Sequence, residues 1–326
     1  MKWEDRIGCR LKLHDLHVLL TVAELGSMGR AARRLSISQP SVSKAIIDIE
    51  RTIGARLLVR SSRGVEATEY GRVLLQRGLG AFDELRQGIR DIEFLSDPAV
   101  GEVYVGCPEA ISAGLLSAVI ERFSRQYPKA VVNVINEGDL AQQLQRLRDR
   151  QVDFLVRRVS DALDDSLNVE VLHPDRLFIV SSRDRPWGRR RKINLSELVN
   201  APWLLSPNFY GPILADIFEA SGLATPDVNV KSFSTHQTIN LLATGRFVSA
   251  LSGGQLYFNG SRFSLKALPV EIATRPWMMA IITLKNRTIS PIAQTFMQCA
   301  REIARPLADL GLRRKAGERR LMIKEG

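Results

Sequence analysis

The stretch that decides the fold is GSMGRAARRLSISQPSVSKAIIDIERTIGARLLVRSSRGVEATEYG, residues 26–71. Apolar residues recur at helical spacing over residues 28–35 and again from Gln39 onward, which predicts two short helices. Ser38 is a good N-cap for the second helix, and Pro40 lies near its start, where a missing N–H costs nothing. Two helices joined by a tight turn, the second with polar residues at its N-terminus, are typical of a helix-turn-helix.

The flanking residues extend this motif to a predicted domain over residues 11–68. Leucines at helical spacing predict a preceding helix over residues 11–25. After the helix-turn-helix, two apolar runs on either side of the basic turn 60–64 predict a two-stranded wing. The sequence therefore predicts an N-terminal, mainly α-helical winged helix-turn-helix.

A long linker helix is expected next, over residues 69–97. Apolar residues fall on one stripe of this helix, namely Leu74, Ala81, Leu85, Ile89 and Ile92. Nothing in its own domain is expected to cover the stripe, so the pattern favours a coiled-coil-like dimer.

From residue 98 to 305 strands and helices alternate, which predicts an α/β domain with largely parallel sheets. This length exceeds that of one mononucleotide-sized sheet, so we expect two lobes with a ligand cleft between strand ends. Lobe I is predicted from residues 98–165 and 270–305, and lobe II from residues 166–269. Residues 306–326 are expected to form a basic, disordered tail.

The charge balance indicates a polyanionic partner. The chain carries 46 Lys and Arg against 35 Asp and Glu, a net charge of +11. Residues 30–63 hold eight basic and two acidic side chains. Such a concentration is expected of a nucleic-acid surface, and the alternative is a solvated basic face.

The sequence shows no sign of membrane insertion or export. No run of about 18 apolar residues is present, and the N-terminal residues lack the apolar segment of a signal peptide. The three cysteines, Cys9, Cys107 and Cys299, are too few and too scattered for a disulfide framework. We therefore expect a cytoplasmic protein without a membrane partner.

Residues 26–71 resemble the N-terminal domain of LysR-type transcriptional regulators. The resemblance consists of residue types at fixed spacings: Gly26-Ser27, Ala31-Ala32, Leu35, Ser38-Gln39-Pro40, Val42-Ser43, Ile49-Glu50, Gly54, Leu57, Arg60, Thr68 and Gly71. Residues 101–305 also look like the effector domain of this family. The similarity therefore covers almost the whole chain.

The resemblance implies duplex DNA, RNA polymerase and a small-molecule effector as partners. It implies a homodimer through the linker helix, often a homotetramer, and an effector domain like a type 2 periplasmic binding protein. The family's DNA-contacting Gln, Pro and Ser map onto Gln39, Pro40 and Ser43, and its wing arginine onto Arg60.

Hydroxyl and cationic groups bind phosphates and base edges, which adds three residues to this set. The predicted DNA contacts are therefore Gln39, Pro40, Ser41, Ser43, Lys44, Arg60 and Arg63.

The predicted effector contacts lie at helix starts and strand ends that face the expected cleft. They are Cys107, Pro108, Glu109, Arg157, Ser206, Asn208, Tyr210, Ser234, Thr235 and His236. The helix ends and Arg157 suit a small anion, whereas Glu109 would repel one and could instead pair with Arg157 or bind a sugar hydroxyl. Cys107 is either a redox sensor or a small apolar filler.

Signatures of catalysis are missing from the sequence. It contains no HExxH, GxSxG or GxxxxGK motif and no cysteine pair with metal-ligand spacing. We expect no cofactor and no enzymatic activity. The predicted function is a LysR-type DNA-binding transcriptional regulator that is switched by a small-molecule effector. The alternative is a two-lobe small-molecule-binding or transferase-like protein with an incidental basic N-terminus.

Overall fold

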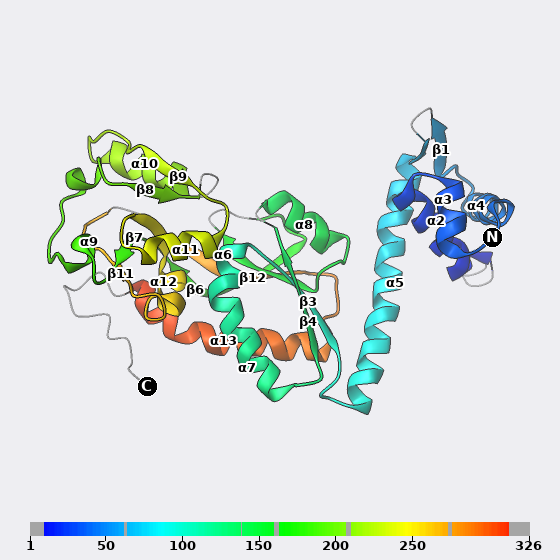
Figure 1. The fold of residues 1–326 in the computed structure, drawn as a ribbon. Helices are drawn as coiled ribbons and strands as arrows, with labels where there is room; N and C mark the ends of the chain where they lie inside the picture. Colours follow the sequence, from blue (N-terminus) through cyan, green and yellow to red (C-terminus); the bar gives the residue numbers. More distant parts are fainter. Residues whose placement is uncertain are drawn as a thin grey trace. The chain divides into compact units, whose positions relative to one another are not determined.

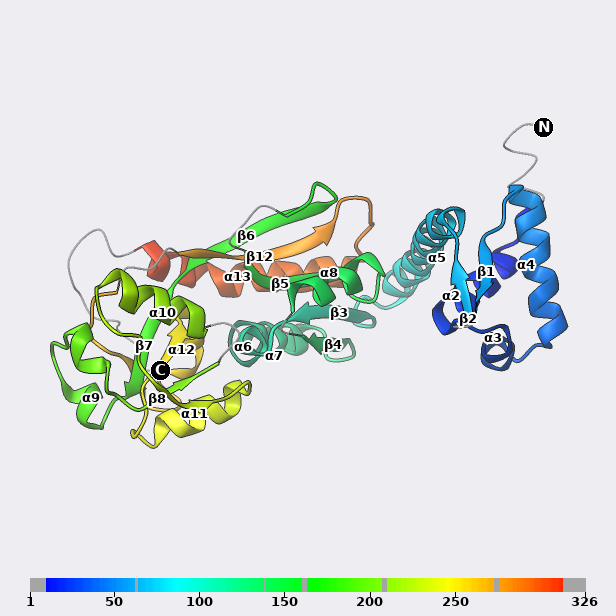
Figure 2. The ribbon, with the colours of Figure 1, turned by 90° about the horizontal axis from the view of Figure 1, so that it is seen from above.

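The structure is a computed structural model that describes residues 10–61, 64–137, 139–159, 163–206, 210–272 and 276–312. The chain divides into two compact units, the first ending at Ile89 and the second beginning at Arg90. Figures 1 and 2 show the elements of each unit from two sides. Each unit has its own hydrophobic core.

The first unit is a winged helix-turn-helix, as predicted. Its elements are α2 (Leu13–Leu25), α3 (Met28–Leu35), α4 (Gln39–Ile53) and the antiparallel strands β1 (Leu58–Ser61) and β2 (Gly64–Ala67). Two of its helices, α3 and α4, have a serine as their N-cap residue. Ser27 Oγ accepts a hydrogen bond from Arg30 N at 3.3 Å, and Ser38 Oγ accepts one from Ser41 N at 3.2 Å.

Helix α5 (Glu69–Ser96) packs closely on the other elements of the first unit. A Cβ atom at Gly71 would collide with the Leu57 carbonyl, and one at Gly78 would lie 2.9 Å from Leu16 Cδ1. Leu74 packs against the helix-turn-helix core. The prediction that Leu74 belongs to an uncovered stripe is therefore wrong, because the glycines bring this part of α5 against α2 and the wing.

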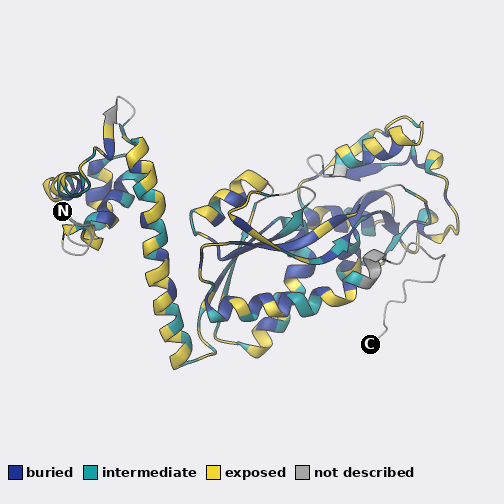
Figure 3. Cartoon of the chain, turned by 180° about the vertical axis from the view of Figure 1, so that it is seen from behind, coloured by how far each residue is buried: buried dark blue, intermediate teal, exposed yellow. Residues whose placement is uncertain are grey.

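The rest of the predicted stripe remains uncovered along α5. Leu85, Ile89 and Ile92 are 51%, 59% and 65% exposed, and Leu95 continues the row at 82%. Figure 3 shows exposed residues recurring down this helix.

Lobe I of the second unit contains a five-stranded sheet in the order β4-β3-β5-β12-β6. The strands are β3 (Glu102–Cys107), β4 (Val131–Asn136), β5 (Phe154–Val159), β6 (Leu167–Asp175) and β12 (Trp277–Leu284). β3 runs parallel to β4 and β5, whereas β12 runs antiparallel to β5 and β6 because the chain returns from lobe II. The helices are α6 (Glu109–Ile111), the π-helical η1 (Ser112–Leu116), α7 (Ser117–Gln126), α8 (Leu140–Arg148) and α13 (Pro291–Leu312).

Lobe II is built on two small sheets. Strand β7 (Leu177–Ser182) lies between β10 (Ser249–Ser252) and β11 (Leu265–Ala267), both antiparallel to it, and β8 (Trp203–Leu205) pairs in parallel with β9 (Val228–Lys231). The helices are α9 (Pro186–Arg189), η2 (Leu195–Leu198), α10 (Tyr210–Ala220), α11 (Thr235–Ala243) and α12 (Gly253–Asn259).

Two predicted boundaries of the second unit need correction. Residues 167–175 form β6, which pairs with β12 in the sheet of lobe I, so lobe II begins after Asp175 and not at residue 166. Helix α13 continues beyond residue 305 to Leu312, because Ala304 and Leu307 are buried in the core of lobe I. Residues 313–326 of the predicted tail lie outside the described residues.

A buried carboxylate connects the end of α5 to the sheet of lobe I. Asp153 Oδ1 accepts hydrogen bonds from Arg90 Nη1 at 3.2 Å and from Arg287 Nη2 at 3.1 Å. Its Oδ2 accepts one from Tyr104 N at 2.8 Å. Arg90, six residues before the end of α5, is therefore bonded to Asp153 at the start of β5 within the second unit.

Candidate functional site

The polar start of α4 forms the candidate nucleic-acid surface. Figures 1 and 2 show α4 on the side of the first unit away from α5. Its buried residues are Val42, Ala45, Ile46 and Ile49. The predicted contacts Gln39, Pro40, Ser41 and Lys44 are exposed, and Ser43 is half-buried. The amphipathic pattern of this helix thus holds the polar residues at the surface.

The hydroxyl groups at this helix start are partly engaged in capping. Ser41 Oγ lies 2.8 Å from Ser38 Oγ, while Ser41 N donates to the same Ser38 oxygen. Ser41 therefore helps to fix the first turn of α4 as well as presenting a hydroxyl group.

An exposed isoleucine completes this surface and was missed by the sequence analysis. Ile47 is 53% exposed and follows Lys44 by three residues and Ser43 by four. Side chains at these spacings lie on one face of a helix. An apolar side chain on such a face can contact a thymine methyl group in the major groove. The signal was available in the sequence, since Ile47 falls outside the buried stripe of α4.

The wing is fixed to the helices by side chains of the quoted motif. Glu50 Oε1 accepts hydrogen bonds from Leu57 N at 2.7 Å and Leu58 N at 3.1 Å. Thr68 Oγ1 donates to Arg56 O at 2.8 Å and accepts from Gly71 N at 3.0 Å. These two motif residues thus serve the scaffold of the DNA-binding unit.

The two predicted wing contacts are only partly described. The backbone of Arg60 lies in β1, opposite Val65, but its side chain is outside the described residues. Arg63 lies entirely outside them.

The ligand cleft was predicted at strand ends of the two lobes. The parallel strands β3, β4 and β5 end at one edge of lobe I, and β8 and β9 end at one edge of lobe II. Glu109, in α6 of lobe I, contacts Thr235, in α11 of lobe II. Glu109 Oε1 accepts a hydrogen bond from Thr235 N at 3.0 Å. One predicted residue from each lobe is therefore in direct contact.

The Glu109 carboxylate occupies the start of α11. Ser234 Oγ caps the same helix by accepting from Gln237 N at 3.3 Å. Two of the first N–H groups of α11 thus have oxygen partners from the chain itself. Glu109, one predicted partner of Arg157, instead accepts from Thr235 N, and Arg157 donates to Gln143.

Arg157 is oriented by lobe I alone. Its Nη1 donates to Gln143 Oε1 at 2.9 Å and its Nε to Arg158 O at 3.2 Å. Burial lowers the pKa of this guanidinium, and the charge of Asp139 opposes that change. Arg157 therefore lies beside α8, near the strand ends of lobe I.

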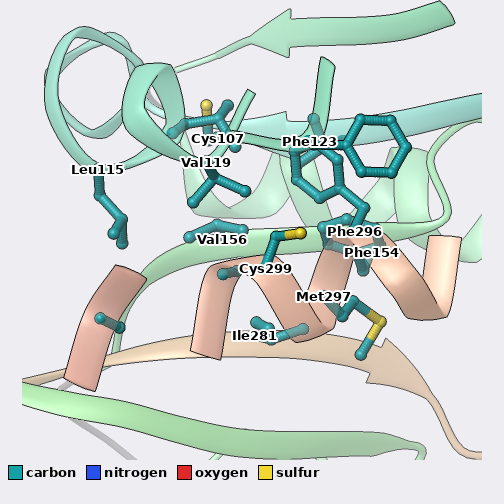
Figure 4. Packing of buried hydrophobic residues seen from close by; sticks show 14 of the residues in the cluster. Cys107, Leu115, Val119, Phe123, Phe154, Val156, Ile281, Phe296, Met297 and Cys299 are labelled. Atoms are coloured by element: carbon teal, nitrogen blue, oxygen red, sulfur yellow. The ribbon is translucent and has the colours of Figure 1, made fainter. Parts of the chain in front are cut away.

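Cys107 is part of the core and not of the cleft surface. It is fully buried at the end of β3, and burial raises the pKa of its thiol to about 12. Figure 4 shows Cys107 and Cys299 among apolar side chains of the same cluster. These observations favour the apolar filler over the redox sensor, because a reactive thiol needs exposure and a low pKa.

Most of the remaining predicted effector contacts lie near the ends of helices and strands. Pro108 is the N-cap of α6, Ser206 follows β8, and His236 is exposed on α11, where its ring contacts Asn240. Tyr210 begins α10, although its side chain is not described, and Asn208 lies outside the described residues.

A small cavity of about 20 Å³ lies at the β6–β7 crossover between His173, Asp175, Phe178, Gly253 and Leu307, and none of the predicted effector contacts lines it. No described helix is long and apolar enough to cross a membrane. No group of three or more described His, Cys, Asp or Glu residues could hold a metal ion.

Comparison with known families identifies both units. Residues 13–72 match the family described as bacterial regulatory helix-turn-helix protein, lysR family. Residues 96–305 match the LysR substrate binding domain.

The chain belongs to the LysR family of transcriptional regulators. It is a DNA-binding regulator with an effector-binding domain.

Individual LysR-family relatives match over nearly the full length. The regulator TdcA of Escherichia coli is 30% identical over 295 residues, which cover 89% of this chain and 93% of TdcA. The regulator GbpR of Azospirillum brasilense is 27% identical, covering 90% of this chain and 87% of GbpR.

Solved LysR-family structures share the fold. ArgP of Mycobacterium tuberculosis has a TM-score of 0.65 at 20% identity and covers 89% of this chain and 96% of its own. CrgA of Neisseria meningitidis, a LysR-type transcriptional regulator, has a TM-score of 0.53 at 19% identity, with 89% and 98% covered. These likenesses support the winged helix-turn-helix and the two-lobe α/β unit.

Proposed function

We propose that this LysR-family regulator reads its operator through the first three turns of α4. The observation that carries the proposal is a surface of Gln39, Lys44 and Ile47, which are all exposed on a helix whose opposite side forms the core. Gln can hydrogen-bond adenine, Lys can reach guanine or phosphate, and an aliphatic side chain can contact a thymine methyl group. Ser41, Ser43 and Pro40 shape and flank this surface, and the wing arginines Arg60 and Arg63 add phosphate or minor-groove contacts.

Substitution of Gln39 tests this assignment. Gln39→Ala is expected to weaken binding to the operator by about 1–3 kcal/mol and to relax selectivity at one base pair. Arg51→Ala is the matched control, because Arg51 is exposed on the last turn of the same helix, where it pairs with Asp48 at 3.4 Å. The operator would first be selected from random duplexes with wild-type protein, and affinities would be measured by gel shift. Equal affinity and selectivity of Gln39→Ala and wild type would contradict the assignment.

We further propose that two copies of the chain pair through the exposed stripe of α5. Leu85, Ile89 and Ile92 are large apolar residues that this chain leaves more than half exposed. A matching stripe on a second copy would bury them, and pairing would present two α4 helices to two half-sites. A homodimer or homotetramer is consistent with this surface.

For the cleft, we propose an effector that offers hydrogen-bond donors to Glu109. The helix start that would attract an anion already holds the Glu109 carboxylate at 3.0 Å from Thr235 N. A carboxylate ligand would meet a like charge there, whereas an amine or a polyol could bind the free lone pairs of Glu109. Ser206, Ser234 and His236 supply further polar groups, and Arg157 lies at the lobe I edge.

The effector is expected to act by shifting populations. A ligand that binds one lobe arrangement more tightly changes how the dimer holds DNA, by no more than its difference in affinity for the two arrangements. We infer action by binding and not by catalysis, in the cytoplasm where chromosomal DNA and RNA polymerase are present. Membership of a regulator family supports this inference.

A further inference from the structure

A second concentration of positive charge lies in lobe II. Residues 183–192, RDRPWGRRRK, contain six basic side chains and one acidic side chain. The other residues between 90 and 312 include 19 basic and 22 acidic side chains. The loop is therefore strongly basic within a unit that is otherwise slightly acidic.

The backbone of this loop is fixed at both ends. Arg183 N donates to Ser264 O at 2.6 Å, and Ile193 N donates to Pro269 O at 3.1 Å. Gly188 is buried, and a Cβ atom there would collide with the Ser182 and Arg183 carbonyls. All six basic side chains of the loop are nevertheless exposed, namely Arg183, Arg185, Arg189, Arg190, Arg191 and Lys192.

Neighbouring segments add to this charge. The side chain of Arg185 lies against Gly245, which precedes the exposed Arg246. Lys266 Nζ donates to Gly188 O at 3.0 Å. We name the surface formed by Arg183, Arg185, Arg189, Arg191, Lys192 and Arg246 the lobe II basic face.

The charges of this face are not neutralised within the described part of the chain. Arg190 pairs with Glu197 at 2.6 Å, and it is the one basic residue of the loop with a described carboxylate in ion-pair distance. Its guanidinium also lies 5.8 Å from the ring centre of the half-buried Trp187. The other charges of this face are therefore available to an anionic partner.

The composition of the face favours a phosphate backbone over an acidic protein. None of the large apolar side chains that are exposed in the described residues belongs to this loop. Protein interfaces normally have an apolar core, which this face lacks. Arginine predominates over lysine, and its planar fork binds phosphate oxygens in pairs.

We propose that the lobe II basic face binds the phosphate backbone of duplex DNA, outside the segment that α4 reads. This contact is independent of base sequence and adds to the recognition by the first unit. Its signature is salt dependence, because each neutralised phosphate releases counterions and steepens the fall of log affinity with log salt by about 0.9.

The test uses the full chain with Arg189, Arg191 and Lys192 all replaced by Gln. Binding to labelled duplexes of about 25 and 150 base pairs of random sequence is measured by fluorescence anisotropy at several salt concentrations. On the long duplex the slope is expected to be shallower by about 2 to 3 than for wild type. The matched control replaces Arg125, Lys129 and Lys285 by Gln, which removes the same charge from exposed positions of lobe I.

Two outcomes would overturn the proposal. An unchanged slope shows that the face does not contact DNA, and an equal change in the control shows an effect of net charge alone. A variant that keeps the wild-type slope but loses transcription with purified RNA polymerase would assign the face to an acidic protein partner. Failure of the α4 assignment is distinguishable, because Gln39→Ala is read out on selectivity and this variant on the salt slope.

Discussion

Helices α4 and α11 both begin with a serine N-cap, but the surroundings of their N-termini differ. Each helix is capped by a serine, with Ser38 accepting from Ser41 N at 3.2 Å and Ser234 accepting from Gln237 N at 3.3 Å. The α4 start has its side chains exposed, whereas the α11 start is occupied by the carboxylate of Glu109 from the other lobe. The same local chemistry therefore leaves one helix start open to a polyanion and closes the other with an internal anion.

The largest expected effect is the loss of pairing between two copies of the chain, which would present two α4 helices to DNA. Ile89→Asp places a charge in the exposed apolar stripe of α5 and should prevent pairing of two copies. Operator affinity should then fall by about 100-fold or more, because two half-sites are no longer held together. Sedimentation velocity and gel shift measure the two effects. Gln76→Asp, at an exposed polar position of the same helix, serves as the control. A variant that stays oligomeric would show that the stripe is not the pairing surface.

A smaller effect is expected at the closed helix start. Glu109→Ala removes the acceptor from Thr235 N and should destabilise the second unit by about 1 kcal/mol in urea unfolding. Acetate should restore part of the lost stability, because its carboxylate can take the vacated position, and chloride at equal ionic strength should restore less. Glu121→Ala, which breaks an exposed pair with Arg125, is the control. If acetate stabilises all three proteins equally, Glu109 does not fill an anion position.

The smallest expected effect is a decrease in the stability of the second unit at acidic pH, caused by His173. Burial lowers the pKa of His173 below its usual 6.5, and the neighbouring Asp175 charge opposes that shift. The unfolded chain therefore takes up a proton at higher pH than the native one, so stability should decrease as the pH falls from about 7 through 6.5. We expect this loss of stability to increase further as the pH falls to 5.5.

Thermal unfolding at pH 7.5, 6.5 and 5.5 measures this dependence. Asp175 and Arg176 line the same cavity as His173 and could also contribute to the pH dependence. The unfolding temperatures of wild type are therefore compared with those of His173→Gln at each pH. A variant with the same pH slope as wild type would exclude His173 as the cause.

Local signals made the first unit predictable. Its helix limits follow from capping serines, a proline in the first turn and glycines at the helix ends, all within a few residues of the feature they determine. Leu74 was misplaced because its burial depends on the close approach that Gly71 and Gly78 permit, which helical periodicity does not reveal.

The second unit depended more on contacts between distant residues. Residues 167–175 were assigned to lobe II, whereas β6 belongs to lobe I because it pairs with β12 more than 100 residues later in the sequence. The contact of Glu109 with Thr235 joins residues 126 positions apart, so the sequence could place each at a helix start but could not show that they meet. Arg157 was placed at a strand end, yet its neighbour Gln143 comes from another element.

Asp153 is a shared acceptor for three separate segments of the second unit. Its carboxylate accepts hydrogen bonds from Arg90 in α5, from Tyr104 N in β3 and from Arg287 after β12. Removing this one buried acid would leave two cations without their common counter-charge, a loss larger than that of a surface ion pair. Three parts of the chain that are far apart in sequence therefore depend on a single side chain.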